Sequence, residues 1–290
     1  MDHPSSDTAS WQQLGSIAPN DLVDARLRLH WAAQPVAALS TSLNPAEDDD
    51  SHTNLGWLTK HGGALAGRPV AGPRPHAAAL RLADATVLQL DADQEVMSEL
   101  PLDGQTAAYA LQWLSEEYEV VTGQAPPAEL RWSDYDMPKH PNGDGAPFAL
   151  DGPRFAEISR WFGNAAAVLD AVAAGEAGAS EVRCWPHHFD IATLITVSGS
   201  GESAKTIGVG LSPGDESTHP EPYWYVNLWP HPPADAALPE LPAGGWHREG
   251  WTGAVLTGSD VVAAGDGAAQ LRRTEAFLDA AIAACRGLLG

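Results

Sequence analysis

Apolar residues recur every three to four positions in four stretches of the chain, which is the spacing of a helix with one buried face. These stretches are residues 22–36, 107–118, 155–172 and 271–285. Asn20 and Asp103 precede the first two stretches and are expected to cap their helices. Pro35 should kink or end the first helix, and Gly175 should stop the third.

Shorter apolar and β-branched runs lie between these stretches and predict strands. Ala77–Leu82 and Thr86–Leu90 are close enough to form a hairpin, whereas the Gly- and Pro-rich residues 60–76 predict a loop. Further strands are predicted in the second half of the chain, at Phe189–Val197, Thr206–Leu211, Tyr223–Trp229 and Ala254–Thr257. Because successive strands follow one another without helices between them, we expect antiparallel sheets and an α+β fold.

Composition along the chain suggests two halves, each with short antiparallel strands flanked by long helices. The predicted division is an N-terminal tail at 1–20, a first half at 21–125, a Pro- and Gly-rich connector at 126–150 and a second half at 151–290. We expect the second half to be a β-meander packed on helices. Trp11 is the residue that could dock the tail.

The chain is strongly acidic, with 16 Lys and Arg against 38 Asp and Glu and a net charge of −22. This argues against binding to nucleic acid or to an anionic membrane, because phosphate recognition needs clustered basic side chains. No apolar run approaches the length of a membrane span, and the start of the chain lacks a signal-peptide pattern. Two distant cysteines fit a reducing compartment, so we expect a cytoplasmic protein.

The 11 tryptophans could fill cores or line a pocket, and the oligomeric state stays open.

Alternation in two predicted strands of the second half suggests a ligand-binding face. Gly208 and Gly210 leave one face of their strand bare, which lets another group approach closely. In the next strand, one face carries four aromatic or amide side chains: Tyr223, Tyr225, Asn227 and Trp229. These four could form the floor of a small-molecule site. Aromatic rings packed on glycine inside a core would give the same pattern.

Two adjacent histidines precede the first of these strands and suggest a second kind of chemistry. Strand alternation would place His188 and Asp190 on one face and His187 on the other. His188 and Asp190 could share a divalent metal, with Glu221, His219 or His231 as a third ligand, or act as a base and its orienting carboxylate. No fixed metal or nucleophile motif accompanies them. The alternative is that Asp190 bonds to nearby backbone while the histidines are partly exposed.

Several segments resemble an uncharacterised bacterial family, the domain of unknown function numbered 5996. Phe189–Ala192 is similar to its FDLA strand, Gly210–Gly214 to its GFWPG segment and Pro220–Tyr225 to its PEPAFYAY segment. Trp229–Pro232 resembles its YPEP segment, and Leu29–Gln34 resembles its LHLWTQ helix. The resemblance covers most of the chain and is most specific in the second half.

The chain departs from this family at the histidines. His187 and His188 replace a Gly-Ser pair, and Ser212 stands where an aromatic residue is usual. The family has no established activity, so the resemblance implies a fold and no function.

These observations lead to two hypotheses about function. The first is a small-molecule pocket in the second half, with metal- or His/Asp-assisted hydrolytic chemistry. The second is a non-catalytic protein that binds a partner or itself and has no active site.

Overall fold

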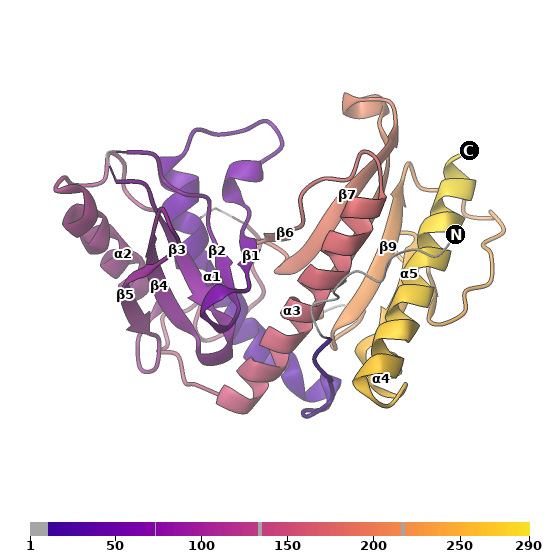
Figure 1. Cartoon of the computed structure of the whole chain (residues 1–290), viewed down its shortest axis with the longest axis horizontal. Helices are drawn as coiled ribbons and strands as arrows, with labels where there is room; N and C mark the ends of the chain where they lie inside the picture. Colours follow the sequence, from indigo (N-terminus) through magenta and orange to yellow (C-terminus); the bar gives the residue numbers. More distant parts are fainter. Residues whose placement is uncertain (1–10, 73, 133–134, 216–217) are drawn as a thin grey trace. The chain divides into compact units, whose positions relative to one another are not determined.

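The computed structural model describes residues 11–72, 74–132, 135–215 and 218–290. It has helices and two antiparallel sheets, which confirms the predicted α+β class (Figure 1). The α-helices are α1 (Val23–Leu43), α2 (Ala107–Thr122), α3 (Gly152–Gly175), α4 (Gly258–Val262) and α5 (Gly267–Leu289). The strands of the first sheet are β1 (Gly56–Leu58), β2 (Ala64–Ala66), β3 (His76–Arg81), β4 (Thr86–Asp91) and β5 (Val96–Pro101). Those of the second are β6 (Arg183–Trp185), β7 (Asp190–Ser198), β8 (Lys205–Ser212), β9 (Tyr223–Trp229), β10 (Gly245–His247) and β11 (Gly253–Thr257).

The chain forms two compact units, whose limits differ from the predicted halves. The N-terminal unit comprises Leu22–Ser159 and Arg183–Asp190. The C-terminal unit comprises the described residues before Leu22, together with Arg160–Val182 and Ile191–Gly290. The segment Arg183–Asp190 therefore belongs to the N-terminal unit, although Arg160–Val182 of the C-terminal unit comes directly before it in the sequence.

The N-terminal unit contains a sheet in the order β1-β2-β3-β4-β5. The predicted hairpin is confirmed as the pair β3 and β4. One face of this sheet meets α2, where the His76 ring contacts that of Tyr118 and Ser98 donates to Glu117. The opposite face carries small and aliphatic side chains that form a buried cluster: Ala64, Ala66, Ala79, Leu88 and Leu90. Alternation along the strands thus gives the sheet two different faces.

The ends of two helices and one loop of this unit differ from the prediction. Thr106, not Asp103, caps α2, and its Oγ1 accepts from the Tyr109 N–H. Asn20 does not cap α1, because Pro19–Leu22 forms a 3₁₀ turn that leads directly into the helix. Pro35 neither ends α1 nor marks its last turn. Residues 60–76 contain β2, so they are not only a loop.

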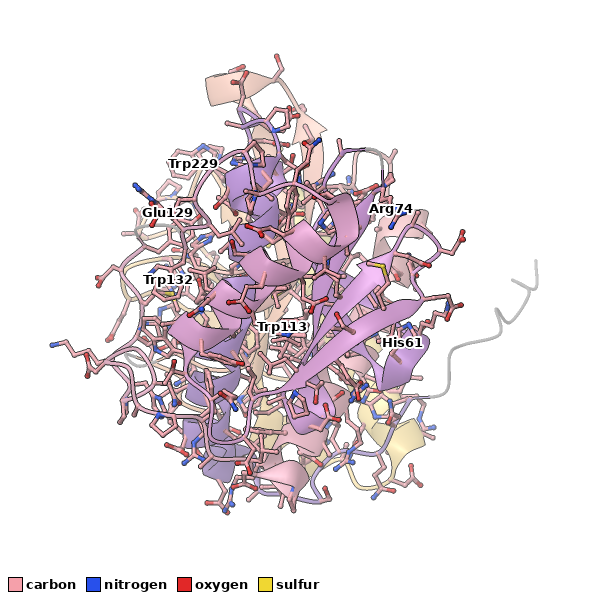
Figure 2. The ribbon with its side chains drawn as sticks, turned by 90° about the vertical axis from the view of Figure 1, so that its left-hand side faces the viewer. His61, Arg74, Trp113, Glu129, Trp132 and Trp229 are labelled. Atoms are coloured by element: carbon pink, nitrogen blue, oxygen red, sulfur yellow. The ribbon has the colours of Figure 1, made fainter. Side chains whose placement is uncertain are left out.

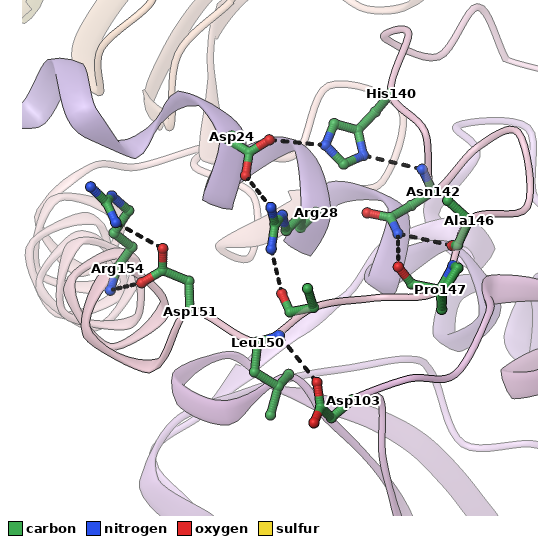
Figure 3. A network of polar contacts seen from close by, with 11 residues as sticks. Asp24, Arg28, Asp103, His140, Asn142, Ala146, Pro147, Leu150, Asp151 and Arg154 are labelled. Carbon is green, nitrogen blue, oxygen red and sulfur yellow. Dashed lines mark hydrogen bonds and ion pairs between the residues drawn. The ribbon is translucent and has the colours of Figure 1, made fainter.

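Residues of the predicted connector bond to the rest of the N-terminal unit (Figure 3). Arg28 of α1 pairs with Asp24 at 2.7 Å and donates to the Ala149 carbonyl at 2.5 Å. The same Asp24 carboxylate meets His140 at 3.2 Å. The Leu150 N–H donates to Asp103 at 3.3 Å, which is the contact this aspartate makes instead of capping α2.

The C-terminal unit is built on strands β7 to β11 of the second sheet, in the order β10-β11-β9-β8-β7. Strand β9 has the predicted bounds, and β7, β8 and β11 lie within one residue of theirs. Helix α5 packs on β8, β9 and β11 (Figure 1). Burial alternates along β9, with Trp224, Val226 and Leu228 at most 1% exposed. These three side chains belong to the core.

Residues 11–14 pack onto α5, as expected from Trp11. The Trp11 Nε1–H donates to Gln270 Oε1 at 3.2 Å. Gln270 is fully buried, and it also accepts from the Leu14 N–H and donates to the Leu14 carbonyl. Because a buried amide satisfied on both ends stabilises its partners, this contact fixes the start of the described chain.

Tryptophans occur in the core, which was one of the two predicted roles, and also at the surface. Trp161 and Trp224 are at most 1% exposed, whereas Trp132 and Trp229, labelled in Figure 2, are 40% and 55% exposed. None of the helices within the described residues has the length and apolar character that crossing a bilayer requires.

Candidate functional site

The two adjacent histidines lie in a turn and not on a strand. Residues 186–189 form this turn between β6 and β7, and the Phe189 N–H donates to the Trp185 carbonyl at 2.7 Å. Phe189 is fully buried and adopts a left-handed backbone with φ 57°. The prediction that strand alternation separates His187 from His188 is therefore wrong, because alternation applies only to extended residues.

Helix α1 holds this turn from within the N-terminal unit. His30 Nε2 and Gln34 Nε2 lie 2.7 and 2.9 Å from the Pro186 carbonyl oxygen. Since a carbonyl only accepts, His30 carries its proton on Nε2. The His30 ring also stacks on Phe189, with centroids 5.2 Å apart and planes 10° apart. Burial lowers the pKa of His30 to about 4, so this histidine is neutral near pH 7.

His187 and His188 lie against each other, with ring centroids 4.2 Å apart. His187 also contacts Tyr135, at 5.0 Å. Its Nδ1 is buried without a hydrogen-bond partner among the described residues, and burial lowers its pKa. His187 is thus a neutral imidazole with one unused ring nitrogen. The catalytic pair His188 and Asp190 stays a prediction.

An aromatic hollow of about 440 Å³ adjoins this turn. Tyr135, which contacts His187, and Gln34, which bonds to Pro186, both line it. Its other walls come from α1, α2 and the connector: Trp31, Leu111, Leu130, Arg131, Trp132 and Met137. The volume is in the range of small-molecule sites, and the walls are mostly apolar.

In the C-terminal unit, the predicted glycine strand meets the predicted aromatic strand directly. Gly208 pairs with Asn227 and Gly210 with Tyr225. A Cβ on Gly210 would lie 2.6 Å from the Tyr225 hydroxyl, and one on Gly208 would lie 2.4 Å from Asn227 Oδ1. The Gly208 N–H donates to that oxygen at 3.1 Å. The two glycines are therefore required by side chains that lie across them.

A continuous row of five rings extends from this point across the same unit. Its members are Tyr225, Tyr223, His219, His247 and Trp251, which we call the ring row. Successive centroids are 6.3, 4.9, 5.6 and 4.6 Å apart, and successive planes are tilted by 54°, 51°, 66° and 33°. Tyr223 is 8% exposed and the other four are partly exposed. Asn227 follows Tyr225 on the same side of β9, as does the more exposed Trp229.

His219 is the residue of the ring row with unused hydrogen-bonding capacity. Its Nε2 is buried and has no partner in the part of the chain that the structure describes. Burial lowers the pKa of His219, and the nearby His247 lowers it further, although Asp215 acts in the opposite direction. His219 is therefore neutral near pH 7.

The strands of the ring row carry no positive charge. No lysine or arginine occurs in β9, β10 or β11. Arg248, next to His247, donates to the carbonyls of Ala234 and Ala236, and Lys205 of β8 donates to the Leu289 carbonyl. These basic groups are bonded to backbone oxygens.

The predicted metal ligands are not assembled in the described residues. Glu221 Oε2 accepts from the N–H and hydroxyl of Ser259 in the first turn of α4, both at 2.6 Å, so this carboxylate is engaged with the helix. Within those residues, no group of three or more His, Cys, Asp or Glu side chains could hold a metal ion. His231 packs on Trp229, with ring centroids 5.4 Å apart.

Sequence reasoning identified part of the ring row and missed the rest. Tyr223 and Tyr225 of the row were predicted by alternation, together with Asn227 and Trp229 beside it, and His219 was considered only as a metal ligand. His247 and Trp251 were missed because they come from β10 and the loop before β11. The signal in the sequence was Gly253, a glycine directly before a predicted strand. In the structure a Cβ at this position would lie 2.4 Å from the Trp251 ring, so glycine is needed where this ring covers the strand.

A scan against protein-family models, a search of curated proteins and a search of solved structures each found no match. The resemblance to the family numbered 5996 therefore stays a prediction.

Proposed function

We propose that this protein binds a small organic cation, of the quaternary ammonium type, on the ring row of the C-terminal unit. The observation that carries this proposal is a row of five tilted rings in a chain of net charge −22. Aromatic faces attract cations, and clusters of them recognise quaternary ammonium groups. A protein of strong negative charge also steers cations toward its surface.

The lack of basic side chains in these strands and the charge state of His219 favour a cation over an anion. An anion site would need basic side chains, and β9, β10 and β11 have none. The lowered pKa of His219 keeps this imidazole uncharged near pH 7, so it does not repel a cation.

Choline and its uncharged isostere 3,3-dimethylbutan-1-ol form a matched pair for testing this proposal by calorimetry. We expect choline to bind and the alcohol to bind at least tenfold more weakly, because the shapes agree and only the charge differs. Tyr225→Leu should weaken choline binding about tenfold, since leucine keeps apolar bulk but loses the ring face. Tyr225→Phe should retain binding. Equal affinity for choline and the alcohol would contradict the proposal, as would a Tyr225→Leu protein that folds and binds choline normally.

A second candidate function is partner binding by the same side of the C-terminal sheet. Trp229 and Leu194 are 55% and 47% exposed, and both belong to strands of this sheet. Exposed large apolar side chains are typical of protein contacts when they gather in one patch. Sedimentation at increasing concentration separates the two functions, because self-association raises the mass and ammonium binding does not.

We also propose a cytoplasmic location. Cys184 and Cys285 are buried free thiols, which is consistent with a reducing compartment.

A further inference from the structure

The N-terminal unit has a separate hollow of about 450 Å³, to which the ring row contributes no residue. Its floor is the face of the first sheet opposite α2. Strand register places Gly56, Ala66 and Ala77 on this face, together with the aliphatic Leu58 and Leu90. Ala66, Ala77 and Leu90 are at most 9% exposed. The hollow exists because glycine and alanine stand where larger residues would fill the space.

Two arginines line this apolar floor. Arg68 donates through Nε to the Ser51 carbonyl at 2.5 Å, which fixes the direction of its guanidinium. Arg183 of β6 lies across Gly56, where an added Cβ would be 2.4 Å from its Nη1. Cys184, the next residue, exchanges two backbone hydrogen bonds with Leu55 at 2.9 and 2.8 Å. β6 and β1 thus hold Arg183 at the hollow.

We infer that this hollow binds a small carboxylic acid with an unbranched apolar chain. The chain would lie on the alanine and leucine floor, and the carboxylate would meet Arg68 and Arg183. Guanidinium groups match a carboxylate with two parallel hydrogen bonds. The volume is within the range of small-molecule sites.

The acidic residues around the hollow favour a singly charged head group. Glu47 and Asp91 also line it, and Arg68 is one of the groups that lower the pKa of Asp49, after hydrogen bonds from Ser51. These carboxylates would repel a phosphate dianion more than a carboxylate. One carboxylate oxygen of Asp91, Oδ1, accepts hydrogen bonds from the N–H groups of Asp93 and Glu95.

Calorimetry on the full chain with butanoate, hexanoate and octanoate tests this assignment. We expect affinity to rise about fourfold with each methylene, because each buries apolar surface on the floor. Octanamide, which has the same chain and no charge, should bind at least tenfold more weakly. Equal affinity for the acid and the amide would overturn the proposal, as would tighter binding of octyl phosphate or no binding of any carboxylate.

Three variants locate the site. Arg68→Gln and Arg183→Gln should each weaken octanoate binding at least tenfold. Gly56→Ala keeps both charges but displaces the flexible end of Arg183, so it should weaken binding while the protein stays folded. Arg131→Gln removes an exposed arginine paired with Glu129 outside this hollow and should change nothing. If Arg131→Gln weakens octanoate binding as much as Arg68→Gln does, octanoate is held by general charge attraction and does not bind in this hollow.

Discussion

Replacing Phe189 by alanine is expected to lower the free energy of unfolding by about 3–5 kcal/mol. The side chain is fully buried, and its ring stacks on His30 of α1. Its loss leaves a cavity at the point where Arg183–Asp190 joins the N-terminal unit. Urea unfolding followed by circular dichroism measures the effect.

Val120→Ala is the matched control for this prediction. Val120 is 74% exposed on α2, so its substitution should change stability by no more than about 0.5 kcal/mol. Phe189→Leu should fall between the two, because leucine fills part of the site. A change below 1 kcal/mol for Phe189→Ala would show that the histidine turn is not anchored by this ring.

Acidification from pH 6.5 to pH 4 should remove roughly 3 kcal/mol of stability through His30 alone. The folded-state pKa of His30 is about 4, against 6.5 for an ordinary histidine. Between these values the unfolded chain binds a proton that the folded protein excludes, so stability rises with pH across this window. The contribution is fully present above pH 6.5 and is lost as pH falls toward 4. Urea titrations at half-unit pH steps measure it.

His30→Phe should remove this part of the pH dependence. Phenylalanine can still stack on Phe189, and Gln34 still donates to the Pro186 carbonyl. Gln34→Leu is the complementary control, since it removes the other donor and leaves His30 able to titrate. Gln34→Leu should lower the free energy of unfolding by about 1 kcal/mol at every pH and leave the dependence of that free energy on pH unchanged. Equal slopes for the wild type and His30→Phe would contradict the account of this buried histidine.

The regular parts of the fold could be predicted because their signals are local. Strand β9 alternates core residues (Trp224, Val226 and Leu228) with aromatic and amide residues on its other side, and its bounds agree with the prediction. Helices α3 and α5 show the three-to-four spacing along most of their length. In these segments the residues that the apolar spacing places on one face are the residues that tertiary packing buries, so the sequence pattern is enough to predict the element.

Other elements could not be predicted because tertiary contacts outweigh local preference. Pro35 sits inside α1, where residues 32–40 are all buried. We infer that this packing outweighs the roughly 3 kcal/mol that proline costs in a helix. Strands β1 and β2 have only three residues each, too few for a period, and β5 is largely exposed at the sheet edge although most of its residues are apolar.

The surroundings of the histidine turn were hidden from the sequence for a different reason. His30 and Gln34 are 156 and 152 positions away from Pro186, whose carbonyl they share. No spacing rule connects residues that far apart. The left-handed backbone of Phe189 is equally unexpected, because bulky residues rarely adopt it. The ring row was partly predictable, since two of its members, Tyr223 and Tyr225, follow a simple alternation along β9.

Imidazole NMR during a choline titration shows whether the ring row binds an organic cation. Resonances of His219 and His247 can be assigned with His219→Gln and His247→Gln variants. We predict that choline shifts both resonances in a saturable way at pH 7.5, leaves that of His30 unchanged, and loses affinity as pH falls through the lowered pKa of His219. Choline binding that moves neither His219 nor His247, or equal shifts with 3,3-dimethylbutan-1-ol, would contradict the claim.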